Sequence, residues 1–499
     1  MRRTFAKRTM FFEAKSVDTI NASYSRQSSN AHHKKEQHKL FLFLLYNNLM
    51  QQNDELIVKI EGFSNLGYGI ARVDGFVIFV EGACPEDEVR VKLTKVTKNY
   101  ANAKVLEVLT PSPFRVEPFC AMQKVCGACQ LQFIDYDYQL KLKKQIVEDA
   151  FRSIGGLDVA IAEPIPSPQI KEYRHKIQYP ISETKVSKRI LAGYYKPASH
   201  EIVNIKHCPI QPQICDEIID FIRNSAFEYG ISGFNEKKHS GDLRHVVIRT
   251  SVATGKNLVV LVVNTTKVFD RLKDFAQAIY SNFKEVSGVC VNFNSKKTNV
   301  ILGEKSECLV GKDFIKERII DKTFRIGANT FFQVNPKSAE NIFKYVKDYI
   351  KNNFENPVVL DAYAGITAFG IVVSDCCKKV VSVEENKESC ELARLTLEAN
   401  EVKNVEIHNM DAAKFFAKEK RKFDVVILDP PRKGCTKESL DEATRLCKGK
   451  IVYVSCNPAT LARDLKYLVT EKGAKIESVQ PFDMFCHTYH IENVAIISF

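Results

Sequence analysis

Short apolar segments alternate with amphipathic segments along the last part of the chain, from about residue 357 onward. Seven of the apolar segments have the length of strands, and helical periodicity fills most of the gaps between them. This alternation is typical of a mainly parallel, doubly wound α/β sheet. The predicted strands are PVVLDAY, KVVSVEE, VEIHNMD, FDVVILDPP, KIVYVSC, KIESVQPFDMF and NVAIISF.

The earlier part of the chain has other patterns. Residues 56–108 form short strand-like runs separated by glycine turns, which favours a small OB-like barrel, a common oligonucleotide-binding module. Residues 160–320 mix strand-like and helical runs. Residues 1–50 are polar and aperiodic, so we expect them to be disordered and dispensable, with the native chain starting at Met50. We therefore predict a multidomain α/β protein with a barrel at 51–110, a central α+β domain at 111–325 and a Rossmann-like domain at 326–499.

Composition indicates the kind of partner and the cellular compartment. The 499 residues carry a net charge of +12, and such a basic balance favours a polyanionic partner. No segment has the length of a membrane span or the form of a secretory signal. With 15 cysteines and no secretory signal, we expect a cytoplasmic protein. In that compartment, clustered cysteines bind metals or catalyse more often than they form disulfides. We also expect a monomer.

Acidic residues follow several of the predicted strands. The first strand runs into a small-residue turn and a helix in VVLDAYAGITAFGI, which is the layout of a nucleotide pocket. Glu384 ends the second strand, where an acid can bind ribose hydroxyls, so the pair favours an adenosine-containing ligand. Asp429 follows the fourth strand in VILDPPRKG, and two prolines fix its turn. Ordinary surface acids at strand ends are the alternative.

Cys456 ends the fifth predicted strand, and Glu492 lies just before the last one. A lone cysteine is more often a buried structural residue. Here, however, a thiol, a carboxylate and an adenosine pocket share one edge of the sheet. These parts suffice for a reaction in which a thiolate adds to an electron-poor ring, the ring attacks a methyl donor, and a base removes the leaving proton. Because the thiolate is the reactive form, we expect a lowered pKa for Cys456.

A cysteine triplet precedes the central domain. Cys120, Cys126 and Cys129 have the spacing C-x5-C-x2-C in CAMQKVCGACQ. Thiolate sites of this kind hold zinc or iron–sulfur clusters, and the spacing alone leaves both open.

The motifs together resemble the RNA uracil-C5 methyltransferases that use S-adenosylmethionine, and within them the iron–sulfur 23S rRNA branch. The resemblance rests on FFQVN at 331–335, DPPRKG at 429–434, SCNPATLARD at 455–464 and HIE ending at Glu492. It implies a TRAM domain as the barrel, a class I methyltransferase domain, and RNA as the partner. It further implies the following sites: S-adenosylmethionine held by Gln333, Tyr363, Glu384 and Asp429, with Asp411 near the adenine; Cys456 as nucleophile and Glu492 as base; and a [4Fe–4S] cluster on Cys120, Cys126, Cys129 and Cys208.

Two departures and three alternatives accompany this resemblance. Thr367 and Ala368 stand where many relatives have glycine and a polar residue, and Cys486 and His487 stand where Pro and Gln are common. The nearest alternative is a tRNA substrate, although the tRNA branch generally lacks both the TRAM module and the cluster. Cytosine-C5 methylation and a non-catalytic RNA-binding factor are the others; SCNP with HIE argues against the first, and an intact Cys456 with Glu492 against the second.

Basic residues are expected to hold RNA phosphates. The candidates are Lys92, Lys95, Lys98, Lys104, Arg174, Lys176, Arg244 and Arg249.

Overall fold

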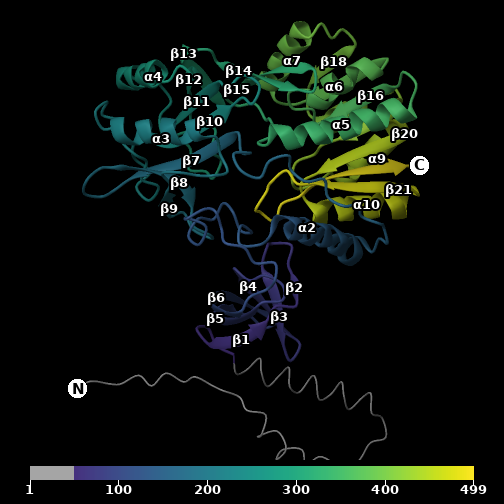
Figure 1. Cartoon of the computed structure of the whole chain (residues 1–499). Coiled ribbons are helices and arrows are strands. Elements are labelled where there is room, and N and C mark those ends of the chain that lie inside the picture. Colours follow the sequence, from purple (N-terminus) through teal and green to yellow (C-terminus); the bar gives the residue numbers. More distant parts are fainter. Residues whose placement is uncertain (1–49) are drawn as a thin grey trace, which may run out of the picture. The chain divides into compact units, whose positions relative to one another are not determined.

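The computed structural model describes residues 50–499, so the predicted disorder and dispensability of the first segment lie outside the described residues (Figure 1). The chain divides into two compact units, Met1–Val116 and Glu117–Phe499. No helix of residues 50–499 has both the length and the apolar character needed to cross a membrane.

The described part of the first unit is a single six-stranded sheet of order β1-β5-β6-β4-β3-β2. Alternate side chains of its strands are buried, as the period-2 pattern of FVIFVE in β4 illustrates, and they form one small core. The strands are β1 (Glu55–Lys59), β2 (Gly62–Phe63), β3 (Gly69–Val73), β4 (Phe76–Glu81), β5 (Glu88–Val96) and β6 (Tyr100–Thr110).

The second unit begins with the cysteine triplet and helix α2 (Tyr136–Ala150), which continues into a π-helical turn, η2 (Phe151–Gly155). A seven-stranded sheet of order β13-β12-β11-β10-β7-β8-β9 follows, together with a β14–β15 hairpin. Helices α3 (Gln213–Ser225) and α4 (Asp270–Asn282) pack on this sheet through apolar faces. The strands are β7 (Lys176–Glu183), β8 (Ile190–Tyr195), β9 (Ile202–Asn204), β10 (Leu243–Thr250), β11 (Asn257–Val263), β12 (Val286–Phe293), β13 (Lys305–Gly311), β14 (Phe314–Ile319) and β15 (Lys322–Gly327).

The last sheet contains all seven predicted strands, in the order β18-β17-β16-β19-β20-β22-β21. Successive side chains enter different cores: Val359 packs on one face of the sheet and Leu360 on the other. A sheet buried on both faces needs continuous apolar strands, which explains the uninterrupted hydrophobic runs in the sequence. The strands are β16 (Val358–Ala362), β17 (Lys379–Glu384), β18 (Val405–Asn409), β19 (Phe423–Leu428), β20 (Cys447–Ser455), β21 (Lys475–Phe482) and β22 (Glu492–Ser498).

The helices of this domain cover both faces of the sheet. Residues of α5 and α6 enter one core, and residues of α8, α9 and α10 enter the other. The first core also contains residues of the middle sheet, so the two sheets share buried apolar surface. The helices are α5 (Pro336–Asn353), α6 (Ala368–Val373), α7 (Lys387–Ala399), α8 (Ala412–Lys418), α9 (Lys437–Leu446) and α10 (Pro458–Lys472), with a 3-10 turn, η3 (Ser374–Cys376).

One strand departs from the parallel arrangement. Strand β22 runs antiparallel to both β20 and β21, because β21 and β22 form a hairpin. Its first residue therefore lies at the edge where the parallel strands end. The register pairs Ser455 with Asn493, so the next residues outward, Cys456 and Glu492, lie next to each other at this edge.

Candidate active site

The turn after β16 is strained and holds polar atoms without partners. Tyr363 and Thr367 both have positive φ angles, 61° and 60°. The Asp361 carboxylate accepts hydrogen bonds from Gly370 N (2.9 Å) and Ser382 Oγ (3.2 Å). Its other oxygen and the Thr367 hydroxyl are buried without a hydrogen-bond partner in the described structure. Strain and orphaned polar atoms at a βα turn are expected where a ligand completes the site.

Glu384, at the end of β17, lies across this turn. One carboxylate oxygen accepts from Gly365 N (2.8 Å) and the other from Asn386 N (2.7 Å). Burial is the main cause that raises the pKa of Glu384, and these two donors oppose it. The fixed carboxylate keeps free lone pairs that suit a diol. Asp411 instead caps α8, accepting from Lys414 N at 3.0 Å.

The loop that follows β19 is tied to the helix that follows Cys456. The Arg432 carbonyl accepts hydrogen bonds from Asn457 Nδ2 (3.1 Å) and Thr460 Oγ1 (3.3 Å). One carboxylate oxygen of Asp464, a buried residue of α10, accepts from Cys435 N at 2.8 Å. The DPPRKG and SCNPATLARD segments thus form one interlocked unit, which fixes Asp429 relative to Cys456.

Two further features tighten this interlock. The Tyr453 hydroxyl, from β20, donates to the same oxygen of Asp464 at 2.6 Å. Gly434 has a φ of 74°, and a Cβ there would lie only 2.5 Å from that oxygen. A side chain at Gly434 would therefore push the loop off α10.

Cys456 is half-buried beside Glu492, which is buried. Burial, and then repulsion from Asp429, raises the pKa of Glu492 to about 8, whereas Arg432 lowers it. Burial and the neighbouring Glu492 raise the pKa of Cys456 to about 11, and Arg432 again opposes the shift. The expected lowering of the Cys456 pKa is therefore wrong for the protein without substrates, because desolvation outweighs the one nearby cation. Arg432 is the site residue that the sequence reading missed, although it lies inside the quoted DPPRKG motif.

Gln333 lies apart from these residues. It lines a small cavity with Lys176 and Arg249. Lys176 has no ion-pair partner among the described residues, and burial, Arg249 and Arg174 all lower its pKa. The cavity thus offers the amide of Gln333 and a lysine amine whose charged form is disfavoured.

Two of the basic residues predicted to hold phosphates are buried instead. Arg249 donates to the carbonyl oxygens of Ala328 and Thr330. Arg244 donates to the carbonyl oxygens of Asn294, Lys296 and Thr298. Their guanidinium groups satisfy backbone acceptors inside the middle domain, so the surface role predicted for Arg244 and Arg249 is wrong.

The four predicted cluster cysteines line one cavity, together with apolar side chains. Cys129 and Cys208 are buried and Cys120 and Cys126 half-buried, and all fifteen cysteines are unpaired. Within the described part of the chain, no three His, Cys, Asp or Glu side chains are grouped as they would be around one metal ion. The cavity therefore brings the four thiols together without forming a single-ion site.

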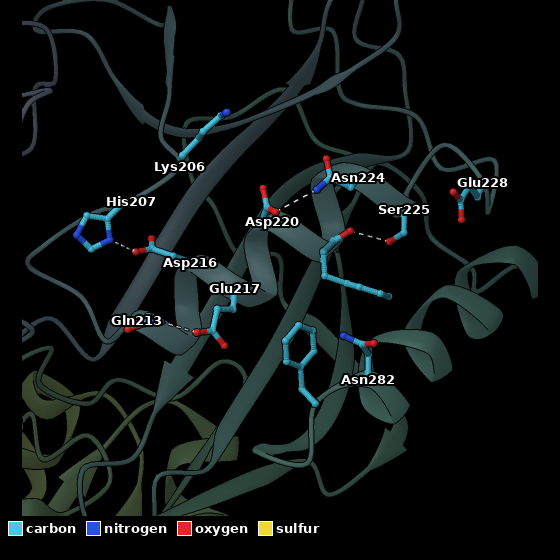
Figure 2. A pocket seen from close by; sticks show the side chains of 12 residues that line it. Lys206, His207, Gln213, Asp216, Glu217, Asp220, Asn224, Ser225, Glu228 and Asn282 are labelled. Carbon is cyan, nitrogen blue, oxygen red and sulfur yellow. Dashed lines mark hydrogen bonds and ion pairs between the residues drawn. The ribbon is translucent and has the colours of Figure 1, made fainter.

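A wide hollow of about 910 Å³ lies beside this cavity, along α3 (Figure 2). Its charged lining is mainly acidic, with Asp216, Glu217, Asp220 and Glu228 beside Lys206. His207, which lines both spaces, contacts Asp216 at 3.0 Å. The hollow contains none of the predicted site residues, and its charge disfavours RNA.

Comparison with known proteins identifies the family. Residues 252–498 match the family model described as tRNA (Uracil-5-)-methyltransferase, and residues 51–106 match the TRAM domain. An uncharacterized RNA methyltransferase of Clostridium tetani is 39% identical over 90% of this chain and 97% of its own length. One from Bacillus cereus is 36% identical over 89% and 97%. The chain belongs to the RNA uracil-5-methyltransferase family. The expected TRAM domain and methyltransferase fold are confirmed.

A solved structure of the same family bears on the substrate. The Pyrococcus abyssi tRNA (uracil-54, C5)-methyltransferase, in complex with S-adenosyl-L-homocysteine, is 30% identical and has a TM-score of 0.71. The match covers 88% of this chain, which is more than the second unit alone, and 99% of that enzyme. Most of this architecture is therefore shared with a tRNA enzyme, so it does not separate rRNA from tRNA methyltransferases.

The buried carboxylates predict how the stability of this RNA uracil-5-methyltransferase depends on pH. The pKa values of Asp361 and Asp429 are raised to about 7, and that of Glu492 to about 8, in each case chiefly by burial. The folded protein thus keeps protons that the unfolded chain releases near pH 4, and its stability falls as pH rises toward 8. Glu492→Gln replaces one of these titrating carboxyl groups with an amide that stays neutral at every pH. As pH rises from 6.5 to 8.5, the free energy of unfolding of this variant, relative to that of the wild type, should therefore increase by about 2 kcal/mol.

Thermal and urea unfolding of the two proteins at these pH values measure the gain. Glu477→Gln serves as a control because the pKa of Glu477, which is paired with Lys450, is lowered rather than raised. If the stability difference between Glu492→Gln and the wild type is the same at each pH, Glu492 has an ordinary pKa.

Proposed function

We propose that this RNA uracil-5-methyltransferase modifies a uridine of 23S rRNA through a covalent bond between Cys456 Sγ and uracil C6. The observation that carries the proposal is that Cys456 and Glu492 lie directly beyond the last β20–β22 pair, Ser455–Asn493, and that the charge of Glu492 acts on Cys456, with Arg432 acting on both groups. A nucleophile and a base on adjacent strands can act on neighbouring ring atoms of one bound base.

The reaction proceeds through the two residues in turn. The Cys456 thiolate forms a bond to C6, and the electron pair moves to C5, which becomes nucleophilic. C5 then forms a bond to the methyl carbon, while the bond from that carbon to sulfur breaks. Glu492 takes the proton from C5, and the returning electron pair expels Cys456 as the thiolate. The base must leave its stack to reach a half-buried thiol.

Both residues must lose protons before they act. With pKa values of about 11 for Cys456 and about 8 for Glu492, both groups are mainly protonated at neutral pH in the free protein. Arg432 is the protein's own cation that favours their charged forms. S-adenosylmethionine would supply the methyl group on a permanently positive sulfur, and that charge, when bound near them, would lower both pKa values further.

The turn after β16 and the end of β17 would hold the methyl donor. Glu384 presents a fixed carboxylate for ribose hydroxyls, and the orphaned Thr367 hydroxyl is available for a polar contact. Tyr363, Asp429 and Gln333 complete the proposed set, with Asp411 at the adenine side. Thr367, a departure from many relatives, is thus compatible with the pocket.

We further propose that Cys120, Cys126, Cys129 and Cys208 hold a [4Fe–4S] cluster. The donor set fits, since four free thiols line one cavity. Thiolate sites of this kind also hold zinc, and it is the family resemblance that favours the cluster. Methyl transfer is redox-neutral, so the cluster's role here is structural.

Protein purified without oxygen is expected to contain about four irons per chain and to be brown. Iron and zinc analysis of the whole protein, with the absorbance spectrum, measures this. Cys208→Ser should lose iron, and Cys390→Ser, a buried cysteine outside the cavity, should keep it. Stoichiometric zinc without iron would refute the cluster.

The substrate is tested by mapping 5-methyluridine in 23S rRNA and tRNA from cells with and without the gene. We expect at least one rRNA uridine to lose its methyl group, and tRNA to remain unchanged. A tRNA substrate is the second candidate, favoured by the Pyrococcus abyssi likeness. Loss of methylation from tRNA alone would establish that candidate and refute the rRNA assignment.

A further inference from the structure

The segment 483–491 joins β21 to β22 and leads directly into Glu492. We call it the 483–491 loop. Glu492 is the first residue of β22 and pairs with Phe482, so the path of this loop determines where the Glu492 carboxylate stands. Most of the loop is buried, although it is not part of a strand or helix. A buried loop needs partners for its polar groups, and those partners are identifiable.

Helix α2 holds the start of the loop. Lys143 Nζ forms an ion pair of 2.6 Å with Asp483, and neither side chain is exposed to solvent. The same ammonium group donates to the Phe485 carbonyl at 2.9 Å. From the first turn of α2, the Tyr136 hydroxyl donates to the second oxygen of Asp483 at 2.9 Å. One helix therefore fixes two successive parts of the loop, almost 350 residues away in sequence.

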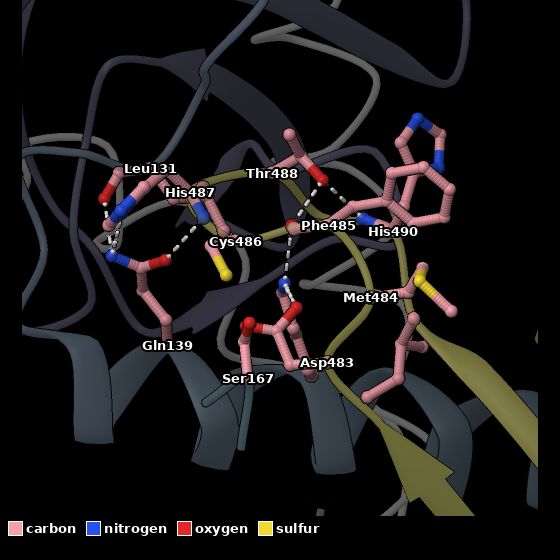
Figure 3. Close-up of polar contacts among 12 residues, drawn as sticks. Leu131, Gln139, Ser167, Asp483, Met484, Phe485, Cys486, His487, Thr488 and His490 are labelled. Atoms are coloured by element: carbon pink, nitrogen blue, oxygen red, sulfur yellow. Dashed lines mark hydrogen bonds and ion pairs between the residues drawn. The ribbon is translucent and has the colours of Figure 1, made fainter. Parts of the chain in front are cut away.

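The same helix holds the middle of the loop, at His487 (Figure 3). Gln139 accepts from His487 N at 3.1 Å, and its amide faces the ring nitrogen Nδ1 at 3.3 Å. Ring atom Nε2 donates to the Ile170 carbonyl at 3.0 Å, and Leu131 N donates to the His487 carbonyl at 2.9 Å. His487 has a φ of 62°, an unfavourable conformation for a residue other than glycine. These contacts hold it there.

The far end of the loop reaches the catalytic groups. Arg432 contacts His490 Nδ1 at 3.3 Å, and Arg432 is the cation that lowers the pKa of both Cys456 and Glu492. Burial, with Arg432 next, lowers the pKa of His490 itself to about 4, so this contact joins a cation to a neutral ring. The loop thus links α2 to the site.

The cysteine cavity lies at the other side of the same network. Leu131, which anchors His487, comes two residues after Cys129, and Cys486 of the loop packs in the same apolar cluster as Cys129 and Cys208. The Tyr173 hydroxyl donates to the Cys486 carbonyl at 2.9 Å. The packing around the four cysteines and the conformation of the 483–491 loop therefore stabilise each other.

From these contacts we infer that Lys143 and Gln139 are positioning residues for Glu492. They hold the 483–491 loop so that the carboxylate reaches the C5 proton after methyl transfer. The inference rests on the proposed function, in which Glu492 resolves the Cys456 adduct. Neither residue has a hydrogen bond or ion pair with Cys456 in the described structure, so adduct formation is expected to depend on them far less than adduct resolution does.

The test separates the two halves of the reaction in the whole protein. Lys143→Met and Gln139→Leu are mixed with RNA and S-adenosylmethionine, and covalent protein–RNA complex and free methylated RNA are followed over time. We expect adduct formation within about threefold of wild type and adduct resolution slower by roughly 10- to 100-fold, because a small misplacement of a reacting group has effects of this size. Lys141→Met, exposed on the same helix, is the control and should behave as wild type.

Three outcomes decide the matter. If both rates fall together in step with thermal stability, α2 has only a structural role and the inference is wrong. If Glu492→Gln traps the adduct but Lys143→Met and Gln139→Leu resolve it normally, the inference fails and the proposed function stands. If Glu492→Gln itself traps nothing, the proposed function fails. Gln139→Leu removes no charge from the core, so it decides the question should Lys143→Met not fold.

Discussion

Cys456→Ala is expected to abolish methylation, with a loss of roughly 10⁴-fold or more in rate, as for other nucleophile deletions. Without the thiolate, no bond forms to C6, and C5 stays too poor a nucleophile to take the methyl group. The half-buried position tolerates alanine, so the variant should fold normally. Transfer of labelled methyl from S-adenosylmethionine to RNA measures the loss.

The control for this variant lies on the same strand. Cys447→Ala changes a half-buried cysteine at the opposite end of β20, far along the strand from the site. It should keep near-native activity and form the covalent complex with RNA. Near-native methylation by Cys456→Ala would overturn the mechanism as a whole.

Much of this candidate site was predictable because most of the proposed functional side chains follow an apolar strand. Parallel strands end at a common edge, so Glu384, Asp429 and Cys456 had to meet near one another once the sheet was recognised. Glu492, just before the last predicted strand, was assigned to the same edge, and the resemblance added its role as base. The physical reason for its position is the antiparallel direction of β22, which the alternating pattern does not encode, because apolar runs have no direction.

The electrostatics could not be predicted in the same way. Whether a thiol has a raised or lowered pKa depends on the balance of burial against a few charges, and sequence order fixes neither. Arg432 lies in a quoted motif, yet only the folded loop places it beside Cys456 and Glu492. Likewise, Arg244 and Arg249 looked like surface charges, and the fold turns both toward backbone carbonyls.

The contacts of α2 with the 483–491 loop could not be predicted from the sequence, for a different reason. Lys143 and Asp483 are 340 residues apart, and both residue types are almost never buried unless paired. A sequence read segment by segment assigns each to the surface. His487 looked like a tolerated departure, but it fills a defined place against Gln139 and the Ile170 carbonyl.

Glu492→Gln should stop the reaction at a different point from Cys456→Ala. The addition to C6 and the methyl transfer remain possible, but the amide cannot accept the C5 proton, so elimination does not begin. Glutamine keeps the shape of a side chain that is buried and has a pKa of about 8, so the fold is expected to persist. The enzyme should remain bonded to a methylated uracil.

This trapped state has a direct signature. A protein–RNA band that survives denaturation and carries the labelled methyl group should accumulate in Glu492→Gln, at close to one RNA per active enzyme, and should be absent from the double variant with Cys456→Ala. The wild type should show the band only transiently, because its Glu492 restarts elimination in each cycle. If Glu492→Gln instead turns over freely, another group removes the proton. Asp429 would then be the first to examine, since its charge already acts on both Cys456 and Glu492.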